Sequence, residues 1–221
     1  MEQLPLAISV QSEPSFDNFT VGENREAVTR VHALASAGEG ERILYVWGPP
    51  GSGCTHLLKA AVSAAGGCYY GPGQAAVTGI DTLVAADHVE CLDDAGQIAL
   101  FRQINRAREG GARVLASGRS APTGLAVRDD LRSRLGWGLV YQLRPLTDDD
   151  KKKHVRAEAA RLGLRIPEEV LLYLFNRLPR DMRSLNAVLR YLDMHSMARQ
   201  RALTLPMVRD AIERFDQQQG K

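Results

Sequence analysis

The stretch Arg42-Ile-Leu-Tyr-Val-Trp-Gly-Pro-Pro-Gly-Ser-Gly-Cys-Thr-His56 decides the fold of this chain. It predicts a short apolar strand that runs into a glycine-rich loop and then into a helix beginning near Thr55. Gly48, Gly51 and Gly53 stand where the pattern G-x-x-x-x-G-K-[ST] of a phosphate-binding P-loop needs a flexible backbone. In such a loop, backbone N–H groups and the helix N-terminus converge on phosphate oxygens. A corner that uses its glycines only for conformational reasons is the alternative.

One position of the loop departs from this pattern. Cys54 stands where the pattern carries a lysine, the side chain that reaches the outer phosphates with a positive charge. We therefore expect a loop that cradles a phosphate but neutralises it poorly.

Length and composition favour one compact α/β unit with a smaller appendage. The chain has 221 residues, 44% of them hydrophobic and 24% charged, and a formal net charge of +2. This charge balance does not demand a nucleic acid as the principal ligand. Three cysteines without a C-x-x-C pair, and no leader or membrane-spanning run, predict a soluble cytoplasmic protein in a reducing compartment.

Helical and extended patterns alternate over the first two thirds of the chain, which predicts right-handed crossovers and a parallel sheet. The predicted helices span 24–36, 55–65 and 95–108, and the predicted strands span 43–47, 68–70, 82–86, 112–117 and 138–143. After residue 145 every segment is helical, with helices predicted at 148–162, 167–178, 181–199 and 204–215. The expected organisation is a flexible arm (1–15), an α/β nucleotide-binding domain (16–145) and a small all-α lid domain (146–221).

An acid follows the third predicted strand directly. Asp87 stands where P-loop folds place the carboxylate that holds Mg²⁺ directly or through water, although Asp also closes many strands without that role. The next position, which carries a second acid in hydrolytic relatives, is His88. The nearby acids Glu90, Asp93 and Asp94 are interpreted as a solvated loop.

Two further segments are candidates for partner contacts. Arg132 and Arg134 come just before the last strand, where oligomeric nucleotide switches present an arginine to a neighbour's γ-phosphate, although arginines there are also ordinary surface cations. In the arm, Gln3-Leu-Pro-Leu-Ala-Ile8 resembles the short peptide by which bacterial replication proteins dock into the sliding clamp. In the alternative, Leu4 and Leu6 only tuck against the domain.

These features in this order resemble an AAA+ nucleotide switch. The segment Ser133-Arg-Leu-Gly-Trp-Gly138, with Ser15-Phe-Asp-Asn-Phe19 and Arg180-Asp-Met-Arg-Ser-Leu185, is similar to the DnaA-related AAA+ family. Within that family the chain looks most like the Hda regulators, because of the clamp-like arm, the altered P-loop lysine and a chain that ends after the lid. We expect an AAA+ P-loop domain with a parallel sheet, followed by the helical lid.

The resemblance implies specific roles. Hda-like proteins bind ADP and sit on the DNA-loaded sliding clamp, so that they contact DNA through the clamp. They make ATP-bound DnaA hydrolyse its nucleotide, which restrains replication initiation. The roles fall to Gly48, Gly51, Ser52, Gly53, Cys54, Thr55, Asp87 and Arg183 for nucleotide, Arg134 for the arginine finger, and Gln3, Leu4 and Leu6 for the clamp. Whether Mg²⁺ accompanies ADP, and whether the chain forms a homo-oligomer, stays open.

The sequence departs from this family at Cys54, at His88 and at Arg119, which aligns with the sensor position after the fourth strand. Loss of the lysine and of the second acid removes charge stabilisation of the transition state, so we expect little intrinsic turnover. An activator that lends Arg134 to a partner is the leading hypothesis. An autonomous ATPase or loader is an alternative, as is a nucleic-acid adaptor that uses the lid cations Lys151 to Lys153, Arg156, Arg161, Arg199 and Arg201.

Overall fold

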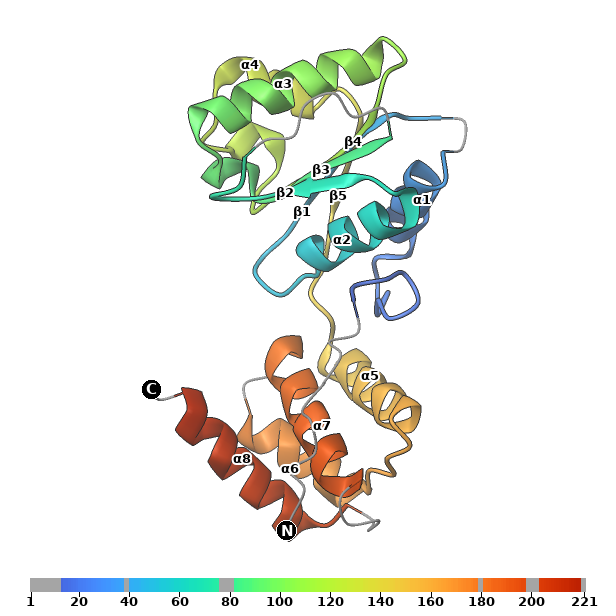
Figure 1. Ribbon diagram of the computed structural model, residues 1–221, viewed down its shortest axis with the longest axis vertical. Helices are drawn as coiled ribbons and strands as arrows, with labels where there is room; N and C mark the ends of the chain where they lie inside the picture. The colour runs from blue at the N-terminus through green and yellow to red at the C-terminus, as the bar shows by residue number, and fades with distance from the viewer. Residues whose placement is uncertain (1–12, 38–39, 76–81, 179–180, 198–202, 220–221) are drawn as a thin grey trace, which may run out of the picture. The chain divides into compact units, whose positions relative to one another are not determined.

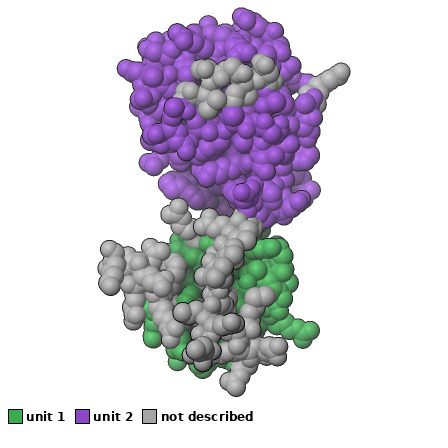
Figure 2. Space-filling view, viewed as in Figure 1, with its two compact units in different colours: residues 1–12, 147–221 green, residues 13–146 purple. Residues whose placement is uncertain are grey.

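In this computed structural model, residues 13–37, 40–75, 82–178, 181–197 and 203–219 are described. They form two compact units that succeed one another after Leu146, an α/β unit and a helical unit, coloured separately in Figure 2. The α/β unit begins at Glu13. Ser15 N–H donates to Asn18 Oδ1 at 2.9 Å, which ties this segment to the turn that follows.

The α/β unit is built on a parallel sheet, as predicted. Its strands are β1 (Ile43–Trp47), β2 (Cys68–Tyr70), β3 (Leu83–Ala86), β4 (Arg113–Gly118) and β5 (Leu139–Gln142), in the spatial order β2-β3-β4-β1-β5. The strand that leads into the glycine-rich loop therefore lies between β4 and β5, with Leu44 opposite both Leu115 and Leu139. Because β1, β3 and β4 are covered on both faces, they read as nearly continuous apolar runs.

Helices cover the two faces of this sheet (Figure 1). They are α1 (Arg25–Ala35), α2 (Cys54–Ala65), α3 (Asp94–Arg108) and α4 (Asp129–Leu135), with short 3₁₀ helices η1 (Val89–Cys91) and η2 (Pro122–Gly124). Because strand side chains alternate, Leu44 and Val46 pack with α1 and α2, whereas Ile43 and Tyr45 pack with α3 and α4.

The helical unit has a core of its own. Its helices are α5 (Asp148–Arg161), α6 (Glu168–Arg177), α7 (Met182–Met197) and α8 (Leu205–Gln219). Thr147 caps α5, because its hydroxyl accepts from Asp150 N–H at 3.1 Å. Leucines and valines at helical spacing, among them Leu171, Leu189 and Val208, are buried together.

Among the described residues, the structure has one α-helix, α4, that the sequence analysis did not assign, besides the two short 3₁₀ helices. Helix α4 is seven residues long, too short to establish a periodic apolar stripe, yet it carries Arg132 and Arg134 and buries Leu131 and Leu135. No helix in the described part of the chain is long and apolar enough to cross a membrane.

Candidate functional site

The glycine-rich loop joins β1 to α2 at the carboxyl end of β1. Gly51 and Gly53 have φ values of +83° and +99°, in the left-handed region that favours glycine. Gly48 is fixed by packing, since an added Cβ would lie 2.5 Å from the carbonyl oxygen of Leu143. Helix α2 begins at Cys54, so its first N–H groups have no intrahelical acceptor and are the groups that would hold a phosphate.

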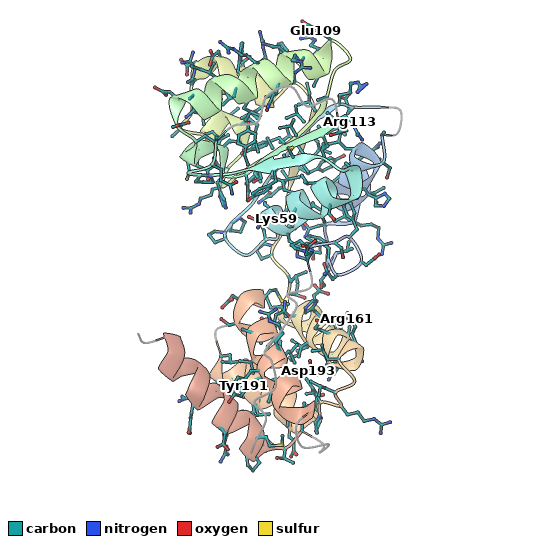
Figure 3. All side chains as sticks on the ribbon, viewed as in Figure 1. Lys59, Glu109, Arg113, Arg161, Tyr191 and Asp193 are labelled. Atoms are coloured by element: carbon teal, nitrogen blue, oxygen red, sulfur yellow. The ribbon has the colours of Figure 1, made fainter. Side chains whose placement is uncertain are left out.

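Cys54 does not replace the missing lysine chemically. Its Sγ lies 3.4 Å from Ser52 Oγ, and burial, above all, raises the pKa of the thiol to about 11, so the group is neutral at pH 7. Helix α2 has one lysine, Lys59, which is labelled in Figure 3, and its Nζ lies 5.2 Å from the centre of the Tyr69 ring. The loop therefore offers backbone donors to a phosphate but no cation from residues 48–55.

Asp87 follows β3 directly, and its side chain is only 1% exposed and accepts four hydrogen bonds. Its Oδ2 accepts from Thr55 Oγ1 and from Tyr69 OH, each at 2.7 Å. Its Oδ1 accepts from Ser117 Oγ and from His88 N–H, the latter at 3.1 Å. These bonds hold the carboxylate beside the start of α2, where the sequence analysis expected it.

The pair Thr55 and Asp87 suits a magnesium ion that arrives with a nucleotide. Hydroxyl and carboxylate oxygens are the ligands that Mg²⁺ takes in P-loop proteins, together with phosphate oxygens and water. Among the described residues there is no group of three or more His, Cys, Asp or Glu side chains that could hold a metal ion. The residues present fit an ion carried by phosphates and not one held by the protein alone.

The position of Glu90 differs from the sequence interpretation, which assigned this residue to a solvated loop. Both of its carboxylate oxygens are buried without a hydrogen-bond partner in the described structure, with His88 Nδ1 at 3.7 Å and Arg119 Nε at 3.8 Å from Oε1. Glu90 is therefore not part of a solvated loop. Helix η1 turns it toward the end of β4, where Gly118 leaves space: an added Cβ there would lie 2.9 Å from Glu90 Oε2.

Two carboxylates lie near the loop at this edge, and one of them, Glu90, has Arg119 and His88 within 4 Å. The charges of Asp87 and Glu90 both contribute to the raised pKa of the Cys54 thiol, after burial itself. Without a lysine, an anionic nucleotide meets two nearby acids and no compensating cation from the loop. His88 adds a left-handed backbone conformation with φ of 49°, which is uncommon for a residue other than glycine.

Arg134 lies in a different environment from its neighbour Arg132. Arg134 Nε donates to Asn105 Oδ1 at 3.1 Å, and its guanidinium carbon lies 3.5 Å from the centre of the Trp137 ring. Among the described residues nothing hydrogen-bonds to its two terminal nitrogens. Arg132 instead pairs with Asp129 at 2.9 Å and donates to a carbonyl oxygen of the preceding loop, so it is a local support of α4.

The sheet separates Arg134 from the glycine-rich loop of the same unit. Arg134 and Trp137 precede β5, whose start lies beside the start of β1, and an added Cβ on Gly138 would lie 1.9 Å from the carbonyl oxygen of Ile43. The loop follows the opposite end of β1. Across the five residues of β1 this separation is about 13 Å, at roughly 3.3 Å per step. Arg134 is thus at the edge of the sheet remote from its own loop.

Several expected site residues are not described. Gln3, Leu4 and Leu6 lie outside the described residues. Arg183 lies on α7, but its side chain is not among those described. Tyr69 is a site residue that the sequence analysis missed, because its contact with Asp87 depends on the order of the strands. Glu90 was named there only as an acid of a solvated loop.

Comparisons with known proteins agree on the fold. A family model described as the lid domain of Hda matches residues 148–212. The crystal structure of domain III of the replication initiation protein DnaA from Thermotoga maritima is 21% identical, with a TM-score of 0.74, over 92% of this chain and 97% of that one.

Two further solved structures are similar. AMPPCP-bound DnaA from Aquifex aeolicus is 23% identical with a TM-score of 0.69, over 87% of this chain and 70% of that one. The Holliday junction branch migration motor RuvB of Thermotoga maritima is 19% identical with a TM-score of 0.66, over 90% of this chain and 71% of that one. The chain therefore has the fold shared by these solved structures, and residues 148–212 of its helical unit match the lid domain of Hda.

Proposed function

We propose that this chain, which has a lid of the Hda type and the fold of DnaA-related AAA+ proteins, is a regulator of replication initiation. It stimulates ATP hydrolysis by DnaA and so converts DnaA to its ADP form. In this proposal the chain is an ATPase activator with little turnover of its own.

The observation that carries the proposal is the place of Arg134. Asn105 and Trp137 hold its guanidinium at the sheet edge opposite the glycine-rich loop. Among the described residues, its two terminal nitrogens have no hydrogen-bond acceptor. A cation there serves a phosphate outside its own subunit. Arginine fingers supplied in trans raise hydrolysis by about 10³ to 10⁵-fold, because they stabilise the charge that develops on the transferred phosphoryl group.

The loop of the same chain supports the division of roles. It has the backbone donors for a nucleotide phosphate, while Cys54 is neutral and His88 stands where hydrolytic relatives carry an acid. We infer that ADP occupies this site with modest affinity, held by the loop from Gly48 to Thr55, with Mg²⁺ between Thr55, Asp87 and the phosphates when it accompanies the nucleotide. Arg183 of the lid would contact the same phosphates.

The last part of the proposal is that the N-terminal arm tethers the chain to the sliding clamp. Gln3, Leu4 and Leu6 would dock into an apolar pocket of the DNA-loaded sliding clamp, with the leucines buried and the glutamine amide hydrogen-bonded. The clamp brings the chain to DNA and raises its effective concentration near DnaA.

Charge pairing in the lid disfavours the nucleic-acid adaptor. Lys151, Lys152, Arg156 and Arg161 lie within 4 Å of acids of the same unit, respectively Asp148, Asp149, Glu168 and Glu158. Cations that already face carboxylates contribute less to a phosphate-binding surface.

The test is a mixture of the protein with ATP-loaded DnaA, DNA-loaded clamp and ADP, in which phosphate release is followed. We expect stimulation that is lost in Arg134→Ala and in a Gln3/Leu4/Leu6→Ala variant, and retained in Arg102→Ala, which removes an exposed arginine of α3. Absence of stimulation by the unmodified protein would overturn the proposal. Turnover without DnaA that disappears in Asp87→Ala would instead support an autonomous ATPase.

A further inference from the structure

The indole ring of Trp137 lies close to the guanidinium groups of two arginines. The guanidinium carbon of Arg134 lies 3.5 Å from the centre of the indole, and that of Arg108, at the end of α3, lies 4.2 Å from the same centre. Both guanidinium groups therefore lie over the indole, and we call Arg108, Trp137 and Arg134 together the stack.

Within the described part of the α/β unit, neither Arg108 nor Arg134 forms an ion pair, although Glu41 lines the same pocket as Arg108 and Trp137. Arg128, Arg132 and Arg144, in contrast, each pair with an acid at 2.9 Å or less. Two cations this close to one ring repel each other, and their attraction to the electron-rich indole opposes that repulsion. The stack keeps two positive charges together and available to an external anion.

The surroundings of the stack suit contact with another protein. Trp137 is 36% exposed and Val140, three residues later, is 38% exposed; they are two of the three exposed large hydrophobic residues of the described chain. Exposed tryptophan beside arginine is the composition typical of the residues that dominate protein interfaces.

We propose that Trp137 is the positioning residue of the arginine finger and that Arg108, which also lies over the indole, helps to hold Trp137 in place. Nε of Arg134 is held by Asn105 and the face of its guanidinium by Trp137, so the terminal nitrogens are presented to the partner's phosphate in one orientation. Orientation matters in catalysis, because a misplacement of about 1 Å costs roughly 10²-fold in rate. This inference rests on the proposed function and specifies how the finger is held.

The test measures the maximal rate and the half-maximal concentration for stimulation of DnaA hydrolysis. We expect Trp137→Leu to lower the maximal rate by roughly 10- to 100-fold, while the half-maximal concentration changes by less than about threefold. Trp137→Phe, which keeps an aromatic face, should restore most of the rate. Arg108→Gln should lower it several-fold, and Arg102→Gln, an exposed arginine removed from the same helix, should not.

A second measurement reports on the stack without DnaA. In a Trp47→Phe background Trp137 is the only tryptophan, and Arg108→Gln should change its emission spectrum whereas Arg102→Gln should not. Arg108 is exposed, so its substitution leaves the core intact.

The outcomes separate the two claims. No stimulation by the unmodified protein overturns the proposed function. Stimulation that is unchanged in Trp137→Leu, or lost equally in Trp137→Phe and Trp137→Leu, overturns the positioning role alone. A rise in the half-maximal concentration at constant maximal rate would also overturn it, because Trp137 would then contribute only to binding.

Discussion

Restoring the lysine of the loop, Cys54→Lys, should strengthen nucleotide binding without creating an efficient ATPase. Position 54 begins α2 and lies beside the N–H groups that would hold the phosphate. Burial is the main cause of the raised pKa of the present thiol and would disfavour a charged lysine, but the carboxylates of Asp87 and Glu90 would favour the protonated ammonium group.

The size of the effect follows from the charge that is added. A hydrogen bond to a charged group contributes a net free energy of about 1.5–3 kcal/mol, which corresponds to roughly 10- to 150-fold in Kd at 1.4 kcal/mol per factor of ten. The Coulomb energy between a lysine ammonium and a phosphate charge 4 Å apart is about 4 kcal/mol for an effective dielectric constant near 20. The expected net gain is smaller than this energy, because desolvation of the new side chain opposes it.

The assay is isothermal titration of the purified protein with ADP and Mg²⁺. Cys54→Gln is the matched control, because it lengthens the side chain without adding charge. We expect at least a tenfold lower Kd for Cys54→Lys and less than a threefold change for Cys54→Gln. Equal affinities of the two variants would refute the reasoning that the loop lacks only a cation.

Three further outcomes follow from the geometry. Gly138→Ala should lower the free energy of unfolding by about 3 kcal/mol or more, seen in urea titrations, because its Cβ would lie 1.9 Å from a carbonyl oxygen at the start of β1. Since burial raises the pKa of the Cys54 thiol to about 11, iodoacetamide at pH 8 should label exposed Cys91 before Cys54, and labelling of Cys54 should rise only as the pH approaches 11, as peptide mass spectrometry would record. Tyr69→Phe should weaken Mg²⁺-dependent ADP binding less than Asp87→Ala does, because Asp87 keeps its three other donors; an equal loss in titration calorimetry would contradict this.

Strand β1 and its loop were predictable because they depend on local pattern. Five consecutive apolar residues followed by Gly48, Gly51 and Gly53 leave few structures other than a strand, a tight loop and a helix, and the structure has all three. Asp87 was predictable for a related reason, since an acid that ends a buried strand downstream of such a loop lies at the same edge of a parallel sheet.

The contacts that complete the site depend on tertiary order. Ser117 reaches Asp87 only because β4 lies beside β3, and Tyr69 reaches it only because β2 is on the other side of β3. Glu90 looked like a surface acid because a three-residue helix has no pattern that reveals which way its side chains turn. Helix α4 was missed because seven residues do not complete a periodic stripe.

The distance between Arg134 and its own loop also follows only from topology. From the sequence, Arg134 is a cation before a strand; in the sheet, that strand starts beside the start of β1, so Arg134 lies at the edge remote from the loop. The interpretation of Arg134 as a finger for another subunit thus gains a physical argument that the sequence lacked.

The most direct test of an activator that acts in trans follows the nucleotide of DnaA alone. DnaA is loaded with γ-³²P-labelled ATP, separated from free nucleotide and mixed with the DNA-loaded clamp and either the unmodified protein, Arg134→Ala or Arg134→Lys. The account predicts rapid release of labelled phosphate with the unmodified protein, a loss of about 10³-fold with Arg134→Ala, and little recovery with Arg134→Lys, because a lysine cannot reproduce the planar guanidinium. Undiminished release with Arg134→Ala would contradict it.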